Sequence, residues 1–521
     1  MNINTAYKSL IAATLLGFAT GTSAQETTGW TPAALELQKE QKLWFHSQNA
    51  AGAAFESLLN YSSLNIDYDR TNGDFKPAQK GDNITTLNVN AEGFINLGSA
   101  YVWGEFNFVH ENVTDALFNA SITDPYRGQP YYVADQGYAS DWRNQYYNMR
   151  FRASTPVFWK RFTVGIDGTY KASLAAKQRD PRTDTRFYNL QLLPAIAVAL
   201  GSHDRLGANM LYSSIKEESN MTKSNTYVDQ TYYEMYGLGT ASSGLGTGRT
   251  TNYYGNKWGF GVQYNHENNG WNILAEFFWN RCVENVDISF STPKKDAMTN
   301  DKTIGGNLTI EKRGEKFTHR LSGSYSRRDI DGIQYLSQRD NTESYLGWVT
   351  LHADVRSTFK TDDIRAAYSL IKNRGNEYSW RADASVNFVN KDDQFILPNS
   401  TMDSKNIYAN VDFKKNFIVT DDMDRRLLAE ARLGMKKSTS GAYKYNGSYA
   451  DYPTVTTLMP LEESYLLSDA WNIGWTMTYS QLVKKDAKVN GYVKIDFNYQ
   501  DAKDFDFGDR SNFTLSLGAN F

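Results

Sequence analysis

SNFTLSLGANF, residues 511–521, ends the chain with apolar and polar residues in strict alternation. One row is apolar or aromatic: Phe513, Leu515, Leu517, Ala519 and Phe521. The other row is small or polar: Asn512, Thr514, Ser516, Gly518 and Asn520. Successive side chains of a β-strand point to opposite faces, so this stretch predicts a strand with one apolar and one polar face. Such a strand suits either the edge of a soluble core or a wall between lipid and water.

The composition favours a wall between lipid and water. The chain has 34 Tyr, 12 Trp and 27 Phe, yet hydrophobic residues reach only 40%. A transmembrane β-barrel has this texture, because half of each strand faces a polar lumen. No uninterrupted run of about 18 apolar residues occurs, which excludes a helical membrane protein. A net charge of -3 gives no reason to expect a nucleic-acid partner.

The first residues predict export. Lys8, the apolar stretch 10–19 and the small residues 22–24 have the pattern of a secretory signal peptide over 1–24. The mature chain would then begin at Gln25. Cys282 is the single cysteine, which excludes a disulfide scaffold.

Residues 25–59 differ from the rest and predict a short helical segment that begins near Thr31-Pro32. The stretch 47–55, with Asn49 near its start, resembles the amino-terminal segment of the long-chain fatty-acid transporter family, although Ala50 replaces a proline. In that family the segment tucks into the barrel as a hatch. The resemblance implies a plug, with Trp44, Phe45 and Asn49 as candidate plug residues. A periplasmic lead-in that packs against the barrel rim is the alternative.

Residues 60–521 contain nineteen stretches with period-2 alternation, among them Leu64–Tyr68. A bacterial barrel with both ends in the periplasm has an even number of strands. The alternation of long and short connections also fails between about 343 and 416, so one stretch there is miscounted. We therefore expect an all-β fold: one up-and-down antiparallel transmembrane barrel of about 18 strands, with 16 or 20 as alternatives. The closing strand should pair with the strand around 64–68.

The connections fall into two sizes, as a membrane barrel requires. Short ones, expected in the periplasm, lie at 201–204, 267–270, 313–315 and 484–488. Long ones, expected outside the cell, lie at about 112–143, 219–252, 286–301, 330–342, 390–403 and 438–464. Three long ones are rich in tyrosine. Their rings suit either stacking on a sugar or packing over the barrel mouth.

Charged residues of both signs fall on the predicted lumen faces. The candidate lumen-lining residues are Glu92, Glu105, Arg150, Arg152, Glu276, Arg320, His352, Asp354, Arg381, Asp383, Asp412, Glu430, Arg432, Lys494 and Asp496. Rings of one sign would select ions. A mixture of signs favours pairing across neighbouring strands, which partly fills the interior.

Residues that could support catalysis or metal binding are few. His352 with Asp354 is the one Asp–His pair predicted to face the lumen, and packing explains it better than general-base chemistry. We expect no enzyme, no cofactor and no metal site, because one cysteine and no histidine pair at ligand spacing are present. The aspartate-rich stretches 421–424 and 504–509 could bind Ca²⁺ through their oxygens, although 504–509 lacks the full spacing of ligands and suits a solvated loop better.

The chain as a whole resembles a family of uncharacterised outer-membrane barrel proteins of the Bacteroidota, associated with TonB-dependent receptors. The resemblance covers the 24–25 boundary, the segment around 44–52, the Tyr- and Asn-rich strands and Phe521. It implies the outer membrane of a Gram-negative bacterium, contact with its lipid, and either a TonB-dependent receptor or a surface lipoprotein as partner. The leading hypothesis is a channel or uptake component for a small polar or amphipathic solute. The alternative is a plugged, non-conducting scaffold for a receptor or a secretion assembly.

Overall fold

The computed structural model describes residues 30–56, 60–97, 100–246, 248–289, 293–342, 345–483 and 489–521. The predicted signal peptide at 1–24 lies outside these residues, as does the predicted turn at 484–488. The described residues form one 18-stranded antiparallel sheet that closes on itself. The predicted barrel and its strand number are therefore confirmed.

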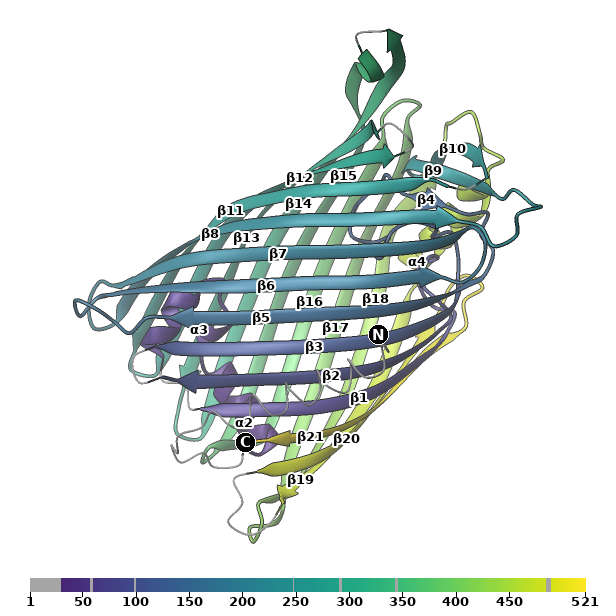
Figure 1. Ribbon diagram of the computed structural model, residues 1–521. Coiled ribbons are helices and arrows are strands. Elements are labelled where there is room, and N and C mark those ends of the chain that lie inside the picture. The colour runs from purple at the N-terminus through teal and green to yellow at the C-terminus, as the bar shows by residue number, and fades with distance from the viewer. Residues whose placement is uncertain are drawn as a thin grey trace, which may run out of the picture.

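Figure 1 shows the tilted strands of the ring and the short helices at its two ends. The strands of the ring are β1 (Tyr61–Gly73), β2 (Asn83–Asn96), β3 (Tyr101–Ala116), β5 (Ser140–Ser154), β6 (Phe162–Lys177), β7 (Arg182–Ala199), β8 (Asp204–Thr222), β11 (Thr250–Asn268), β12 (Trp271–Ser289), β13 (Pro293–Arg313), β14 (Phe317–Thr342), β15 (Tyr345–Arg374), β16 (Glu377–Phe395), β17 (Ser400–Thr420), β18 (Arg425–Lys444), β19 (Ala470–Leu482), β20 (Asn490–Ala502) and β21 (Asp509–Asn520).

The ring closes where the alternation of the last residues predicts. Ala519 of β21 pairs with Leu64 of β1, and Leu515 pairs with Tyr68. The apolar rows of the two strands therefore lie on the same face of the wall. Closure leaves the sheet without an unpaired edge, which a wall in lipid requires.

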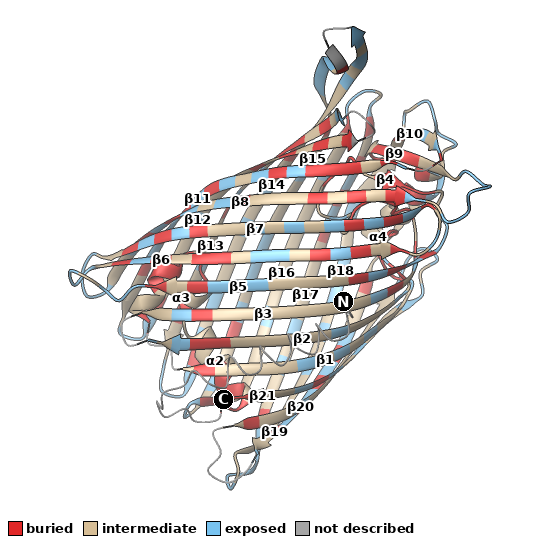
Figure 2. Cartoon of the chain, viewed as in Figure 1, coloured by how far each residue is buried: buried red, intermediate tan, exposed pale blue. Residues whose placement is uncertain are grey.

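The outer surface of the ring is apolar. Along β11, for example, exposed Trp258, Phe260 and Val262 alternate with residues that face the lumen. Figure 2 shows exposed residues alternating with less exposed ones along the strands. A continuous apolar wall around a polar lumen suits lipid outside and water inside.

Helices contribute little to the fold. None of those in the described part of the chain is long and apolar enough to cross a membrane.

One end of the ring carries tight turns. Asn269 and Gly270, which join β11 to β12, have φ values of 48° and 77°. Two consecutive positive φ angles fit the two-residue turns that match the twist of paired strands. Residues 30–56 lie inside the ring at this end, as Figure 1 shows for α2 and α3. We call it the plug end, and the opposite end the loop end.

Three of the predicted long loops at the loop end are instead continuations of strands. β12 ends at Ser289 and β13 begins at Pro293, β14 continues to Thr342, and β16 and β17 are joined by residues 396–399. Beyond the apolar wall these strands have no lipid-facing row, so their sequences lose the alternation on which the prediction rested. The miscounted strand is β15, a single strand of 30 residues that the sequence suggested was two.

Candidate functional site

Residues 30–56 fill the lumen at the plug end, and we call them the plug. The plug contains α2 (Pro32–Glu40), α3 (Leu43–His46) and the 3-10 helix η1 (Ala50–Phe55). Thr31 caps α2 by accepting a hydrogen bond from the Ala34 N–H at 3.3 Å, and Pro32 occupies the first turn, where its missing N–H is harmless. Helix formation in this segment is thus explained by its own first residues.

Two aromatic side chains anchor the plug. Trp44 is fully buried, and its ring N–H donates to Asn265 of β11 at 3.2 Å. A side chain at Gly52 would overlap the Trp44 ring, so glycine allows η1 to lie against it. Phe45 packs edge-on against Trp103 of β3, with ring centroids 5.8 Å apart.

Asn49, also fully buried, joins the plug to the barrel wall. Its side-chain amide donates to the Ile196 carbonyl at 3.1 Å and to Gln263 at 2.9 Å. Its side-chain oxygen accepts from the Ala51 N–H at 2.9 Å. One residue therefore shapes the turn before η1 and joins the plug to two strands of the wall, β7 and β11.

Ion pairs fix α2 to the opposite wall, and we call this group the latch. Its members are Glu36 and Glu40 of the plug with Arg320, Arg381 and Lys414 of the wall. Lys414 and Arg381 lie 2.7 and 3.3 Å from Glu36. Burial disfavours the ionised Glu36, but Lys414, a hydrogen bond from the Tyr378 hydroxyl and Arg381 together outweigh it and lower the pKa of Glu36 below the usual value.

Further candidate residues from the sequence contact the plug. Glu92 pairs with Lys39 at 2.6 Å, Arg152 donates to the Phe45 and Ser47 carbonyls, and Glu276 accepts from the Gln48 N–H at 3.2 Å. Asp383 and Glu430 stand behind the latch, 2.6 Å from Arg381 and 3.8 Å from Lys414.

The remaining candidates lie along the lumen wall or outside the ring. Arg150 pairs with Asp167 at 2.8 Å, and Arg432 reaches over Gly474 to Asp496 at 2.7 Å. Glu105 accepts from Asn90 at 3.0 Å. Asp412 is half-buried opposite Asp383 and Arg432.

His352 and Asp354 lie outside the lumen, contrary to the prediction. β15 pairs with β16 only from Ser357 onward, and β14 pairs with β13 only as far as Gln334. Both residues therefore lie on a two-stranded ribbon beyond the ring, where their side chains are 69% and 66% exposed. The lumen position was inferred from the alternation of inward and outward residues along β15. Two bulges in the pairing of β14 with β15 interrupt this alternation.

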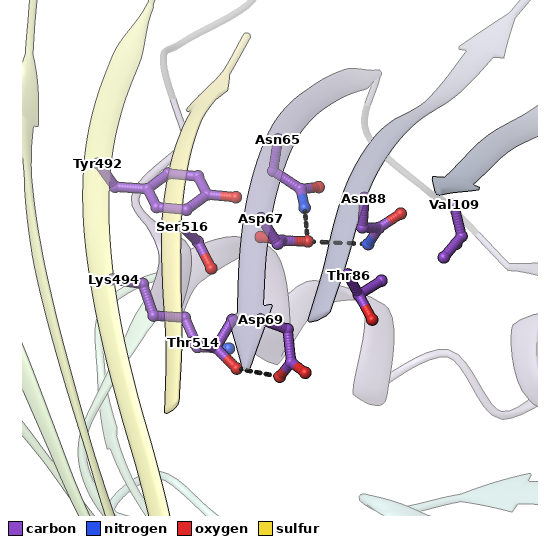
Figure 3. Close-up of a pocket in the computed structure, with 10 residues that line it drawn as sticks. All are labelled: Asn65, Asp67, Asp69, Thr86, Asn88, Val109, Tyr492, Lys494, Thr514 and Ser516. Carbon is purple, nitrogen blue, oxygen red and sulfur yellow. Dashed lines mark hydrogen bonds between the residues drawn. The ribbon is translucent and has the colours of Figure 1, made fainter. Parts of the chain in front are cut away.

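Between the two ends, one side of the wall bounds a cavity of about 480 Å³, drawn in Figure 3. Apart from Val109, each lining side chain carries a polar group, and the lining comes from the five consecutive strands β20, β21, β1, β2 and β3. The residues are Asn65, Asp67, Asp69, Thr86, Asn88, Val109, Tyr492, Lys494, Thr514 and Ser516. We call it the wall cavity. Lys494 belongs to the candidate lumen-lining residues predicted from the sequence, and the alternation also places Asp67 on the lumen face.

The loop end is also filled, which the sequence did not predict. β4 (Val133–Ala134), β9 (Thr231–Gly237) and β10 (Thr240–Leu245) form a small sheet that packs with η2 (Thr454–Leu458) and α4 (Met459–Leu467). Arg127, from the loop 117–139, reaches Glu284 at 2.6 Å and Glu217 at 3.1 Å. Thr123 donates its N–H to Glu217 at 2.7 Å. These loops have no regular alternation in their sequences, so only their length could have indicated that they fill this end of the lumen.

The loop tyrosines partly gather at this end. Tyr449 and Tyr452 stack with centroids 4.8 Å apart, and Tyr452 lies 5.1 Å from Tyr233 of β9. Tyr233 is buried, whereas Tyr449 is 53% exposed. Tyr233 therefore packs over the barrel mouth, as one of the two interpretations expected. Tyr449 still exposes part of its ring to solvent.

In the described part of the chain, no three potential metal ligands among His, Cys, Asp and Glu lie together. In the stretch 421–424, Asp421 and Asp424 instead face Arg426, at 3.6 and 3.7 Å.

Glu56, at the end of the plug, predicts a pH dependence of plug docking. Burial raises the pKa of its carboxyl from 4.5 to about 7, while its oxygen accepts from the Trp44 N–H. Ionisation is therefore costlier in the docked plug than in solvent. The cost is absent below about pH 4.5, grows as the pH rises, and is complete above about 7, where it weakens docking by about 3 kcal/mol.

We expect Glu56→Gln to remove this free-energy cost of ionisation, because glutamine does not ionise. Cleavage of the plug by a protease, measured from pH 4 to 8, should accelerate with pH more steeply in wild type than in Glu56→Gln. The ratio of the two rates cancels the pH dependence of the protease. Glu315→Gln, an exposed carboxyl at the same end, should behave as wild type. An unchanged ratio across this range would contradict the assignment.

Comparisons with known proteins give a family and distant neighbours. Residues 50–521 match a family described as "Family of unknown function (DUF6850)". No curated protein matches. Among solved structures, the ferric preacinetobactin receptor BauA of Acinetobacter baumannii is 8% identical, with 89% of this chain and 80% of that chain covered and a TM-score of 0.41.

Two neighbours come from Pseudomonas aeruginosa. OpdK, solved with vanillate, is 10% identical, with 89% and 99% covered and a TM-score of 0.36. A FadL homologue is 11% identical, with 91% and 92% covered and a TM-score of 0.30. Likeness at this level carries no functional argument.

Proposed function

The chain belongs to DUF6850, a family of unknown function, and we propose from its own geometry that it is an outer-membrane barrel for the gated uptake of a small polar solute. The observation that carries the proposal is the polar wall cavity, which lies in the lumen between a plug and a loop closure. A barrel that served only as a scaffold has no need of a polar cavity inside it.

The plug contacts support a removable gate. They combine ion pairs, such as Lys414 with Glu36 at 2.7 Å and Lys39 with Glu92 at 2.6 Å, with separate small apolar clusters, such as that of Trp44 with Leu274. Polar contacts can exchange for water when the plug leaves, whereas a continuous apolar core cannot. In this proposal the plug end faces the periplasm, and the loop end faces the outside of a Gram-negative cell.

Osmotic swelling of liposomes tests the proposal. The full chain should admit small sugars and amino acids slowly, and the chain without residues 30–56 should admit them at least tenfold faster. Faster swelling with small solutes than with large ones would identify a sieving pore. Equal, background-level swelling with both proteins would overturn uptake as the function.

A non-conducting scaffold is the second candidate, and the β14–β15 ribbon favours it. The ribbon projects beyond the ring and exposes Leu336 and Leu351, which are 62% and 58% accessible. A TonB-dependent receptor or surface lipoprotein would be its partner, as the resemblance to Bacteroidota barrels implies. Co-purification that is lost when the ribbon is shortened, together with absent solute flux, would support this candidate. In either role we propose no enzymatic activity.

A further inference from the structure

We propose that the wall cavity is a binding site for a neutral carbohydrate, built around Tyr492, Asp67 and Lys494. This assignment rests on the proposed uptake function and names the solute class that the lumen would hold. Two rows of side chains, an aromatic surface and fixed hydrogen-bonding groups carry it.

The strand register sets these side chains in rows. Tyr492 pairs with Gly518, which pairs with Asn65. In the next row Lys494 pairs with Ser516, which pairs with Asp67. β21 thus places small residues between the larger ones of β20 and β1. Because neighbouring strands are about 4.8 Å apart, Lys494 and Asp67 stand on opposite sides of a gap about 10 Å wide at the backbone.

Tyr492 presents an aromatic surface to this gap. A Cβ atom at Gly518 would lie 2.2 Å from the Tyr492 ring, so the ring lies directly over the bare backbone of Gly518. Tyr492 also lines the cavity. One face of the ring therefore meets the wall, and the other is available to the lumen. The apolar face of a sugar ring stacks on such a surface.

The hydrogen-bonding groups beside the ring are held in place. Asp67 Oδ2 accepts from Asn65 at 2.7 Å and from Asn88 at 2.9 Å, and Asp69 Oδ2 accepts from Thr514 at 2.8 Å (Figure 3). These bonds fix the carboxylates and leave Asp67 Oδ1 as an acceptor for a ligand. Fixed polar groups lose little conformational entropy when a ligand binds.

Lys494 supplies the donor on the other side. Within the described residues no hydrogen bond or ion pair involves its ammonium group, although it lines the cavity with two carboxylates. An anionic solute would meet Asp67 and Asp69, and a cationic solute would meet Lys494. A neutral polyol uses the donors and the acceptors together, which favours a carbohydrate.

The volume agrees with this class. About 480 Å³ lies within the range of roughly 300–1,000 Å³ of small-molecule sites. We therefore expect a mono- or disaccharide rather than a long glycan in this part of the lumen.

Saturation-transfer NMR on the full chain, in a detergent without a sugar headgroup, tests the site. The probes are maltose, cellobiose, lactose and xylobiose, with triglycine as a zwitterionic comparison. At least one disaccharide should bind, and Tyr492→Leu should weaken it about tenfold through the lost stacking. Gly518→Ala, which displaces the ring, should weaken binding without removing the tyrosine. Tyr499→Leu, a change of the same kind on the outward row of β20, should bind as wild type.

The possible results distinguish failure of the carbohydrate site from failure of the uptake function. Binding of no disaccharide, equal binding in Tyr492→Leu, or stronger binding of triglycine would overturn the carbohydrate assignment. Binding without liposome flux would retain the site and contradict the uptake function. Flux without binding would retain the pore and contradict the site.

Discussion

Replacing Arg381 with glutamine is expected to release the plug. The guanidinium contacts Glu36 and Glu40 of α2 and also Asp383 beside it. Its side chain is only 13% exposed, so water can replace little of what is lost. Removing one partner of a buried ion pair leaves the other charge uncompensated, at a cost of about 3–5 kcal/mol.

Protease cleavage within residues 30–56 measures this release. A loss of about 3 kcal/mol raises the undocked fraction by about a hundredfold, and the cleavage rate should follow it. Arg365→Gln is the matched control, because Arg365 also faces the lumen from neighbouring β15, is exposed, and has no ion pair among the described residues. Cleavage of Arg381→Gln at the wild-type rate would show that the latch does not hold the plug.

The second large effect is expected at the loop end, from Arg127→Gln. Arg127 lies between Glu284 and Glu217, and its guanidinium sits 5.2 Å from the centre of the Tyr253 ring. Burial disfavours the charged guanidinium, but the two carboxylates outweigh it and raise its pKa above the ordinary value. Without it, two buried carboxylates face each other, and we expect loop 117–139 to detach at a cost of about 3–5 kcal/mol.

Chymotrypsin cleavage at Tyr131 and Tyr132 reports the detachment. Arg186→Gln serves as control, because its exposed side chain pairs with Asp184 of the same strand and, among the described residues, makes no ion pair or hydrogen bond with the loop. Replacing Glu217 and Glu284 by glutamine in the Arg127→Gln background should recover most of the protection, because no buried charge then lacks a partner. If the triple variant is cleaved as fast as Arg127→Gln, the ion pairs are not what holds the loop.

The sequence was sufficient for the wall because lipid imposes a pattern on each strand. Phe513 to Phe521 alternate because one side faces lipid, and the same constraint placed the partner strand at 64–68. The start of the plug helix could also be predicted, because Thr31 caps the helix and Pro32 occupies its first turn without help from distant residues. Where strands leave the lipid, as in β14 beyond Gln334, the constraint ends and the prediction failed.

The site was less predictable because its contacts join distant parts of the chain. Glu36 and Arg381 are 345 residues apart, and no local pattern pairs them. The lumen-facing phase did identify Arg381, Arg320 and Glu92 as interior residues, but not their bonds to the plug. The wall cavity escaped notice because its floor consists of Ser516 and Thr514, which the alternation marks only as polar.

Single-channel conductance in a planar bilayer tests the central claim, a polar lumen gated by residues 30–56. Three proteins suffice: the full chain, the chain without residues 30–56, and the plugless chain that also carries Arg127→Gln. We expect rare, brief openings of the full chain, frequent openings after removal of the plug, and the largest, most persistent conductance when both ends are released. Three equally silent proteins, folded and inserted, would contradict it.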